Sequence, residues 1–421
     1  MAVPNVAWPR LVWIAMIMVM LRLSRRWWAA HLMLMTIVLF ATSCGGDSGT
    51  AVGTVTVTVE PGEALVVGIG ETASFSARAV DVSGNMVSGA VTWETNDTRV
   101  ATVRTDGVAM GVATGTTVVT ATLAGAVGTA KLDVFVPQNA AVYERGVSYF
   151  GRGSYVEYIP GDLPVVLSAP HGGALTPSEI GDRTFGTTVT DRNTVELVRA
   201  IRDAFIEQTG LAPHVVISHL RRTKLDPNRD IVEAAQGNPY AEQAWREFQE
   251  WIQVARVAVE ERSERGMYFD IHGHGHDVDR LELGYLLSAA TLNQTDINLD
   301  ALAVVATTSI REIGRDSPLP FSQLLRGPTS FGGFLQVAGV RSVPSPSDPS
   351  PGSEAYFTGG YNARAHGSLS DGEMISGIQI EHHYTGLRDT DQNRRAYATQ
   401  VAAAVRLFMM EHYGFFAPAG E

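Results

Sequence analysis

The stretch VVLSAPHGG at residues 165–173 sets the fold of the larger part of this 421-residue chain. Its short apolar run predicts a buried strand, and the proline and paired glycines predict a sharp turn at His171, where the strand ends. Comparable strands are expected at residues 214–218, 267–271 and 378–381. The four strands are far apart in the sequence, so the segments that connect them decide which arrangement of strands in a sheet is possible.

Helical stretches separate these strands, at residues 194–208, 233–264 and 397–413. Strands that alternate with helices predict an α/β fold, in which a mixed sheet is flanked by helices on both faces. The expected domain occupies residues 148–415 and follows a linker at residues 137–147.

Polar residues stand where three of these strands end. His171 follows the first strand, Arg221 and Arg222 follow the second, and His272 follows the third. In open α/β sheets the ligand site lies beyond the carboxyl ends of the strands. We therefore expect these side chains to meet in one crevice.

His171 and His272 are candidate metal ligands. A neutral imidazole is a common zinc ligand, and catalytic zinc keeps three protein ligands and one open position. Asp270 stands two residues before His272 on the same side of the strand, where its carboxylate can hold the second ring nitrogen. His274 and His276 follow in the same glycine-rich loop. They can belong to the site or can simply be exposed, and we favour exposure.

The order of these features resembles the N-formylglutamate amidohydrolase family, and more distantly the zinc carboxypeptidases and the aspartoacylase and succinylglutamate desuccinylase group. The resemblance rests on PHGG at 170–173, RRTKLDPNR at 221–229, DIH at 270–272 and QIE at 379–381. It implies a zinc-carboxypeptidase-like fold and a hydrolase that cleaves a C–N bond. It also implies a single Zn²⁺ held by two histidines and a carboxylate.

The resemblance gives further residues their roles. It implies that Arg221, Asn228 and Arg229 bind a substrate carboxylate, and a guanidinium does pair bidentately with such a group. A structural salt bridge is the alternative role for Arg229. The resemblance also makes Glu381 the general base, which takes a proton from the attacking water and passes it to the leaving nitrogen. The implied substrate is peptide-like, or an acylated amino acid, with a free carboxylate.

The sequence of this chain differs from the zinc carboxypeptidases and aspartoacylases at the position of the third metal ligand. The carboxypeptidases and aspartoacylases use His-x-x-Glu, but Ala174 stands three residues after His171. Glu179 and Asp191 are the candidates for the missing carboxylate. We expect Glu179, because the loop after His171 can fold it back toward the metal. Asp191 also suits a helix N-cap.

The N-terminal residues predict export. Arg25 and Arg26 precede an apolar run at residues 32–40, and ATSC ends at Cys44, the only cysteine. This pattern is typical of a secretory signal and resembles the lipobox of bacterial lipoproteins, whose cysteine is lipidated. Residues 1–44 are therefore expected to be a lipoprotein signal peptide, with a plain signal peptide as the alternative. The protein is expected at the cell envelope, lipid-anchored to a membrane, either at the outer membrane or facing the periplasm.

A small all-β domain is expected at residues 54–136, after a linker at residues 45–53. Apolar and polar residues alternate in period-two runs broken by turn residues, which is typical of an antiparallel sandwich. The segment resembles the group 2 bacterial immunoglobulin-like domains, with Trp93 as a core aromatic. It has no cluster of His, Asp and Glu for chemistry, so it is expected to bind a surface partner or to act as a spacer.

Two other functions remain open at this point. A net charge of -12 argues against nucleic-acid binding. The domain could be a binding protein with a lost or structural metal, or the run from Asp270 to Asp277, with His272, His274 and His276, could build a two-metal phosphoesterase site. The segment at residues 342–360 is rich in Pro, Ser and Gly and is expected to be a lid, with Tyr361 or His366 reaching the substrate, or a disordered loop.

Overall fold

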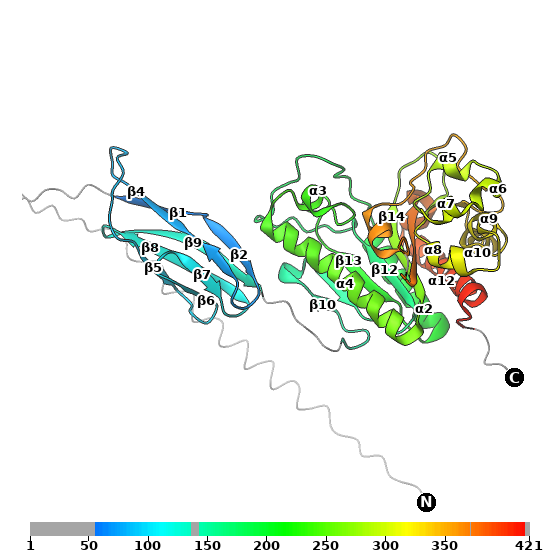
Figure 1. Cartoon of the computed structure of the whole chain (residues 1–421), viewed down its shortest axis with the longest axis horizontal. Coiled ribbons are helices and arrows are strands. Elements are labelled where there is room, and N and C mark those ends of the chain that lie inside the picture. Colours follow the sequence, from blue (N-terminus) through cyan, green and yellow to red (C-terminus); the bar gives the residue numbers. More distant parts are fainter. Residues whose placement is uncertain (1–54, 136–142, 371, 417–421) are drawn as a thin grey trace, which may run out of the picture. The chain divides into compact units, whose positions relative to one another are not determined.

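The computed structural model describes residues 55–135, 143–370 and 372–416 (Figure 1). The expected signal peptide and Cys44 lie outside the described residues. Among the described residues, no helix is both long enough and apolar enough to cross a bilayer.

Residues 56–135 contain only strands, turns and loops. The strands are β1 (Thr56–Glu60), β2 (Glu63–Val67), β3 (Thr72–Ser74), β4 (Ser76–Val80), β5 (Thr92–Thr95), β6 (Ala101–Val103), β7 (Val108–Gly111), β8 (Gly115–Leu123) and β9 (Ala126–Phe135). They pair as β1-β4, β2-β9-β8-β5 and β3-β7-β6. The pairs are antiparallel except β2 with β9, which is parallel and departs from the fully antiparallel arrangement expected.

The alternation in the sequence explains how this region forms a core. In β1, Val57 and Val59 are buried while Thr56, Thr58 and Glu60 are exposed, as a period of two requires. Their partners are apolar side chains of β4, β8 and β9, and Trp93 packs against the same cluster as the expected core aromatic. The β-rich content is confirmed, and the immunoglobulin-like assignment stays a prediction.

The α/β region is built on one mixed sheet. Its strands are β10 (Tyr149–Phe150), β11 (Val156–Ile159), β12 (Val165–Ala169), β13 (His214–Ser218), β14 (Gly266–Gly273), β15 (Leu281–Gly284), β16 (Ser342–Val343) and β17 (Ile375–His382). Their order is β10-β11-β13-β12-β14-β17-β15-β16. The four central strands β13, β12, β14 and β17 are the four that the sequence predicted, and they run parallel.

The edge strands were not predicted, and they run differently from the centre. β11 is antiparallel to β13, β10 is antiparallel to β11, and β15 is antiparallel to β17. β10 and β16 have only two residues each, too few for a periodic pattern to show in the sequence. The expectation of a mixed α/β sheet is confirmed.

The helices of this region are α2 (Thr194–Thr209), α3 (Ile231–Ala235), α4 (Pro239–Ser263), α5 (Ala289–Leu292), α6 (Asp296–Leu299), α7 (Leu302–Val305), α8 (Arg311–Asp316), α9 (Phe321–Arg326), α10 (Phe331–Val337), α11 (Tyr361–His366) and α12 (Asp391–Tyr413). The helix expected at residues 233–264 is in fact two, α3 and α4. Gln236 and Gly237 both have positive φ, and Asn238 caps the new helix ahead of Pro239, so the first helix ends there.

The two faces of the sheet carry different helices. Val165, Leu167 and Ala169 of β12 pack in one core with α2 and α12, while Val166 packs in the other with α4. Figure 1 shows α5 to α10 gathered beside α12, away from α3 and α4. Because side chains alternate between the faces, Ser168, Asp270 and His272 lie on the face that α4 covers.

Candidate metal centre

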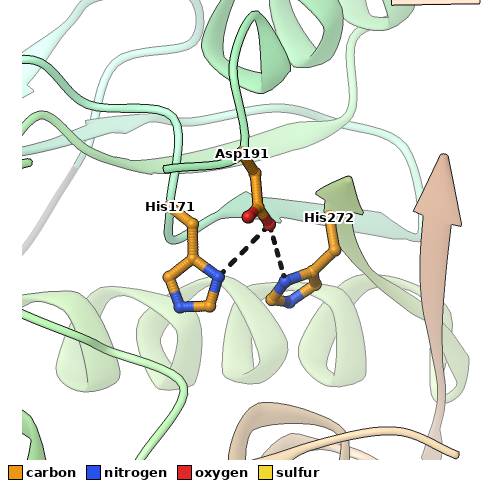
Figure 2. Close-up of side chains that lie close together, drawn as sticks. All are labelled: His171, Asp191 and His272. Atoms are coloured by element: carbon orange, nitrogen blue, oxygen red, sulfur yellow. Dashed lines mark hydrogen bonds and ion pairs between the residues drawn. The ribbon is translucent and has the colours of Figure 1, made fainter. Parts of the chain in front are cut away.

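Three buried side chains from three separate segments meet beyond the carboxyl ends of the central strands. His171 follows β12, Asp191 lies in the loop before α2, and His272 is near the end of β14 (Figure 2). One carboxylate oxygen of Asp191, Oδ2, lies 3.3 Å from Nδ1 of His171 and 3.3 Å from Nδ1 of His272. The three side chains are at most 6% exposed.

The other ring nitrogen of each histidine is held by a second buried carboxylate. His171 Nε2 lies 2.6 Å from Asp226 Oδ1, and His272 Nε2 lies 2.7 Å from Asp270 Oδ2. An ionised carboxylate can only accept, so each Nε2 carries the hydrogen. In a neutral ring the lone pair is then on Nδ1, which faces Asp191.

This arrangement fits a cation. With the hydrogen of each neutral ring on Nε2, two Nδ1 lone pairs and the Asp191 Oδ2 oxygen face one another, which is unfavourable unless a proton or a cation lies among them. Ligand atoms about 2.0–2.1 Å from one tetrahedral zinc lie about 3.3 Å apart, and the two contacts of Asp191 have that length. Imidazole nitrogen and carboxylate oxygen are also the donors that zinc takes.

The electrostatics show how strongly the centre requires positive charge. Burial alone lowers the pKa of His272, but the carboxylates of Asp270 and Asp191 outweigh it and hold that pKa well above its usual range. Burial alone raises the pKa of Asp191, but its contacts with His171 and His272 hold it below its usual range. A proton and a metal ion therefore compete for the same place.

Further groups fix the carboxylates. Gly273 N–H donates to Asp191 Oδ2 at 3.1 Å, and Arg222 Nε donates to Asp226 Oδ2 at 3.0 Å. Asp270 accepts from the Ser168 hydroxyl and from the Asn362 side-chain amide. The partners of the imidazoles are thus themselves held in place, as the surroundings of a metal site require.

Glu381 stands beside this cluster. It pairs with His272 across the parallel strands β14 and β17, so the two side chains lie on the same face of the sheet. Burial, helped by the charges of Asp191 and Glu282 and opposed by His272, raises the pKa of Glu381 to about 7. A carboxyl group poised near neutral pH suits proton transfer.

Glu179 does not lie with the histidines, which corrects the expected third carboxylate. Its carboxylate accepts from the Tyr155 hydroxyl and lies 3.5 Å from Arg152 Nη1. Asp191, the alternative, occupies the place expected for Glu179. Nor does Asp191 cap a helix, because Asn193 is the N-cap residue of α2. The loop after His171 leads Glu179 away, while the backbone N–H of Asp191 donates to the His171 carbonyl at 3.1 Å.

The three residues expected to bind a substrate carboxylate differ in how far they are buried. Asn228 is buried, where its amide donates to Gln379 at 3.3 Å and accepts from Asn362 N–H at 2.8 Å. Arg229 is about one-third exposed and lies 3.2 Å from Glu233. Arg221 is exposed beside a cavity of about 280 Å³ that also contacts Gly172 and Thr190, the chain neighbours of two cluster residues.

His274 and His276 form a second group with Glu282, with ligand atoms within 4.8 Å of one another. His274 Nε2 lies 2.8 Å from the Arg280 carbonyl and must donate to it. Its Nδ1 lies 3.2 Å from the His276 N–H and must accept from it. The only lone pair of a neutral His274 is therefore engaged, so this group is not prepared for a metal. His274 is buried, which corrects the expectation that it is exposed.

One residue of the site, Asp226, was not predicted to take part in it. It lies inside the RRTKLDPNR stretch, next to residues that the resemblance assigns to substrate binding, and Arg222 of that stretch was expected in the crevice without a specific role. A buried acid opposite a histidine 55 residues away in sequence leaves no local pattern.

The structure describes the segment at residues 342–360 and the two side chains after it that were expected to reach the substrate. The Tyr361 ring lies tilted by 58° against the Trp245 ring, with centroids 5.7 Å apart. His366 is buried, with Nε2 2.6 Å from Gln249 Oε1, so it is not the expected substrate-contacting group of a lid.

No protein-family model matches this chain, and no curated protein matches it. The gene product Atu2144 from Agrobacterium tumefaciens is similar in structure, with 15% identity over 61% of this chain and 95% of its own, at a TM-score of 0.36. N-formylglutamate amidohydrolase from Ralstonia eutropha JMP134 has 12% identity over 62% of this chain and 98% of its own, also at 0.36.

Part of this chain is also similar to a fragment of a surface-layer protein. Domains 4 and 5 of the S-layer protein SbsC are 26% identical over 19% of this chain, at a TM-score of 0.18. This chain spans about half, 51%, of the length of that fragment. Likenesses at this level do not assign an activity, which has to be argued from the site itself.

Proposed function

We propose that the α/β region is a zinc-dependent hydrolase that cleaves an amide bond in a substrate with a free carboxylate. The observation that carries the proposal is the convergence of His171 Nδ1, His272 Nδ1 and Asp191 Oδ2, with two contacts of 3.3 Å. The order of motifs in the sequence, which resembles the N-formylglutamate amidohydrolase family, supports the same chemistry.

His171, Asp191 and His272 would hold the ion, and three protein ligands leave one position open, as in catalytic zinc sites. A bound zinc ion would supply Lewis acidity, which polarises a carbonyl oxygen and makes water more acidic. Asp226 and Asp270 fix the two rings by their Nε2 hydrogens, so the Nδ1 lone pairs stay directed at one point. That fixed direction is the contribution of these two carboxylates.

Glu381 is the general base in this proposal. Its pKa of about 7 lets it accept a proton from the attacking water near neutral pH. Gln379 Nε2 donates to Glu381 Oε1 at 2.9 Å, which orients the carboxylate on the face that carries His272. Of the three residues that the resemblance implies for a substrate carboxylate, Arg221 and Arg229 keep their guanidinium groups accessible.

The proposed setting is the cell envelope. We propose lipidation at Cys44 and export, with the all-β region as an immunoglobulin-like spacer between the membrane and the hydrolase. Support comes from the sequence around Cys44 alone. Changing Cys44 to Ser should move the protein from the membrane to the soluble fraction, and continued membrane attachment would overturn the anchor.

The test of the catalytic proposal combines metal analysis with turnover. The purified protein should carry about one zinc per chain by mass spectrometry of its metals, and a chelator should remove both zinc and activity. N-acyl amino acids should be cleaved, and the same compounds with the carboxylate blocked as an amide should be cleaved more slowly. Two metals per chain with phosphoesterase activity, or no metal at all, would overturn the proposal.

A further inference from the structure

A second acid–histidine pair stands beside Glu381, and the proposed chemistry does not use it. His276 Nδ1 lies 2.8 Å from Glu282 Oε1. Glu282 is fully buried, and its other oxygen accepts from the Phe357 N–H at 2.7 Å. The carboxylate is thus fixed from two sides, and it holds the imidazole at one nitrogen.

The ring of His276 is also fixed in plane. It stacks on the Phe357 ring with centroids 4.6 Å apart and an interplanar angle of 13°. Its backbone N–H donates to His274 Nδ1. The side chain of His276 is 24% exposed, and Nε2 makes no hydrogen bond with the described residues. The imidazole is thus held through Nδ1 and its ring face, and the side chain remains partly exposed.

The sheet brings this pair to the proposed base. Glu381 of β17 pairs with His272 on one side and with Glu282 of β15 on the other. Register partners point to the same face, and neighbouring strands lie about 4.8 Å apart. His272, Glu381 and Glu282 therefore form a row on one face, and His276 extends from the end of that row.

We propose that His276 is a catalytic residue that donates a proton from Nε2 to the leaving nitrogen, and that Glu282 is its positioning residue. The inference rests on the proposed hydrolase function. It divides proton transfer between Glu381, in the middle of this row, and His276, beyond its Glu282 end. Glu381 removes a proton from the water, and His276 delivers one to the departing amine.

The step balances with water as the only co-reactant. Water oxygen bonds to the carbonyl carbon, and one water proton passes to Glu381. The carbon–nitrogen bond then breaks as His276 Nε2–H passes its proton to the nitrogen, which leaves as an amine. His276 keeps its Nδ1–H to Glu282 and regains an Nε2 proton through solvent, while Glu381 releases its own. The net change is amide plus water to acid plus amine.

The test uses substrates that differ only in the leaving group. A succinyl alkylamide needs a proton on its nitrogen to depart, whereas succinyl 4-nitroanilide has a far better leaving group. His276→Ala should lower kcat/KM for the alkylamide by about 10²–10⁴-fold, the range of general acid–base catalysis, and for the nitroanilide by less than about tenfold. Added imidazole should restore part of the alkylamide activity only.

The chain offers a matched control. His219 Nε2 lies 2.8 Å from Glu157 Oε2, with the histidine side chain 22% exposed, but on the far side of β12 from Glu381. His219→Ala should leave the ratio of the two substrates unchanged. Glu282→Gln should shift that ratio in the same direction as His276→Ala but by less, with zinc content unchanged. His276→Gln, which keeps the size of the side chain, repeats the test if the alanine variant fails to fold.

The outcomes separate the two proposals. A wild-type protein that holds no zinc, or that cleaves neither substrate, overturns the proposed function and this inference with it. An active, zinc-bearing wild type with His276→Ala and His276→Gln losing activity equally on both substrates overturns the inference alone. Selective loss on the alkylamide with imidazole rescue supports His276 as the proton donor.

Discussion

Two groups of two histidines and one acid lie side by side at the carboxyl edge of the sheet. In both, the possible ligand atoms lie within 4.8 Å of one another. In the group of His171, Asp191 and His272, buried carboxylates hold the outer nitrogens and leave the inner ones free. In the group of His274, His276 and Glu282, the protein itself uses both nitrogens of His274.

The difference shows that spacing alone does not make a metal site. What decides is the partner of the second ring nitrogen, because that partner sets which nitrogen keeps a lone pair. A carboxylate on Nε2 prepares Nδ1 for a cation. A carbonyl on Nε2 and a backbone N–H on Nδ1 satisfy the ring completely. The first group could therefore hold a metal ion, whereas His274 of the second group offers no free lone pair to one.

Replacing the acid in each group tests this comparison with the largest expected effect. Asp191→Asn removes the negative charge between the two imidazoles, so zinc affinity should fall by more than the roughly 10–100-fold that loss of a supporting hydrogen bond costs. Zinc per chain after dialysis measures it. Glu282→Gln and Glu179→Gln should keep zinc. Loss of zinc from either variant would show that the metal is not bound by His171, Asp191 and His272.

Glu381→Gln should separate metal binding from turnover. The amide keeps the shape of the side chain but cannot accept a proton, so kcat should fall by about 10²–10⁴-fold while zinc remains bound. Single-turnover kinetics and metal analysis on the same sample measure both. Loss of zinc in this variant would make Glu381 a ligand, and full activity would place the base elsewhere.

The sequence predicted the sheet's centre and two of the three cluster side chains, and the reason is local. Apolar strands of four to five residues with a histidine at the end are visible within one stretch of chain. The third carboxylate depends on how the loop at residues 172–193 folds, which no period reveals. The prediction of Glu179 assumed that this loop folds back to the metal at residue 179, whereas the structure brings Asp191 there.

Contacts between residues that are distant in the sequence could not be predicted either. Asp226 is 55 residues from His171, and Glu282 is paired with Glu381 only through an antiparallel edge strand that was not predicted. Asp270 was predicted correctly as the partner of His272 Nε2, because a separation of two residues on a strand puts both side chains on one face.

Asp226→Asn sharpens the comparison at the outer nitrogen. The amide can accept from His171 Nε2–H, but it lacks the charge that makes the imidazole a strong ligand. Zinc affinity should fall by about 10–100-fold without abolishing binding. Competition with a chelator of known affinity measures the change. An unchanged affinity would show that the charge on the outer carboxylate does not matter.

Glu247→Gln tests whether a raised pKa alone marks a catalytic acid, and it should have no effect on turnover. Burial raises the pKa of Glu247 to about 7, as it does for Glu381, but its partners are Gln243 and the Arg152 N–H rather than the histidines. Its ordinary value is 4.5, so the folded state favours the neutral form. The stability that this preference gives is complete below pH 4.5 and is lost as the pH rises through about 7.

Glutamine stays neutral, so the variant should gain stability relative to the wild type across that window, by roughly 3 kcal/mol at pH 8. Urea unfolding at pH 5 and pH 8 measures the difference, with Glu261→Gln, an exposed position on the same helix, as the control. A variant gain that is equal at both pH values would mean that Glu247 titrates normally. If Glu247→Gln instead lowers kcat as Glu381→Gln does, burial rather than the neighbouring histidines accounts for the role of Glu381. The position of Glu381 beside the histidines would then not distinguish it from Glu247.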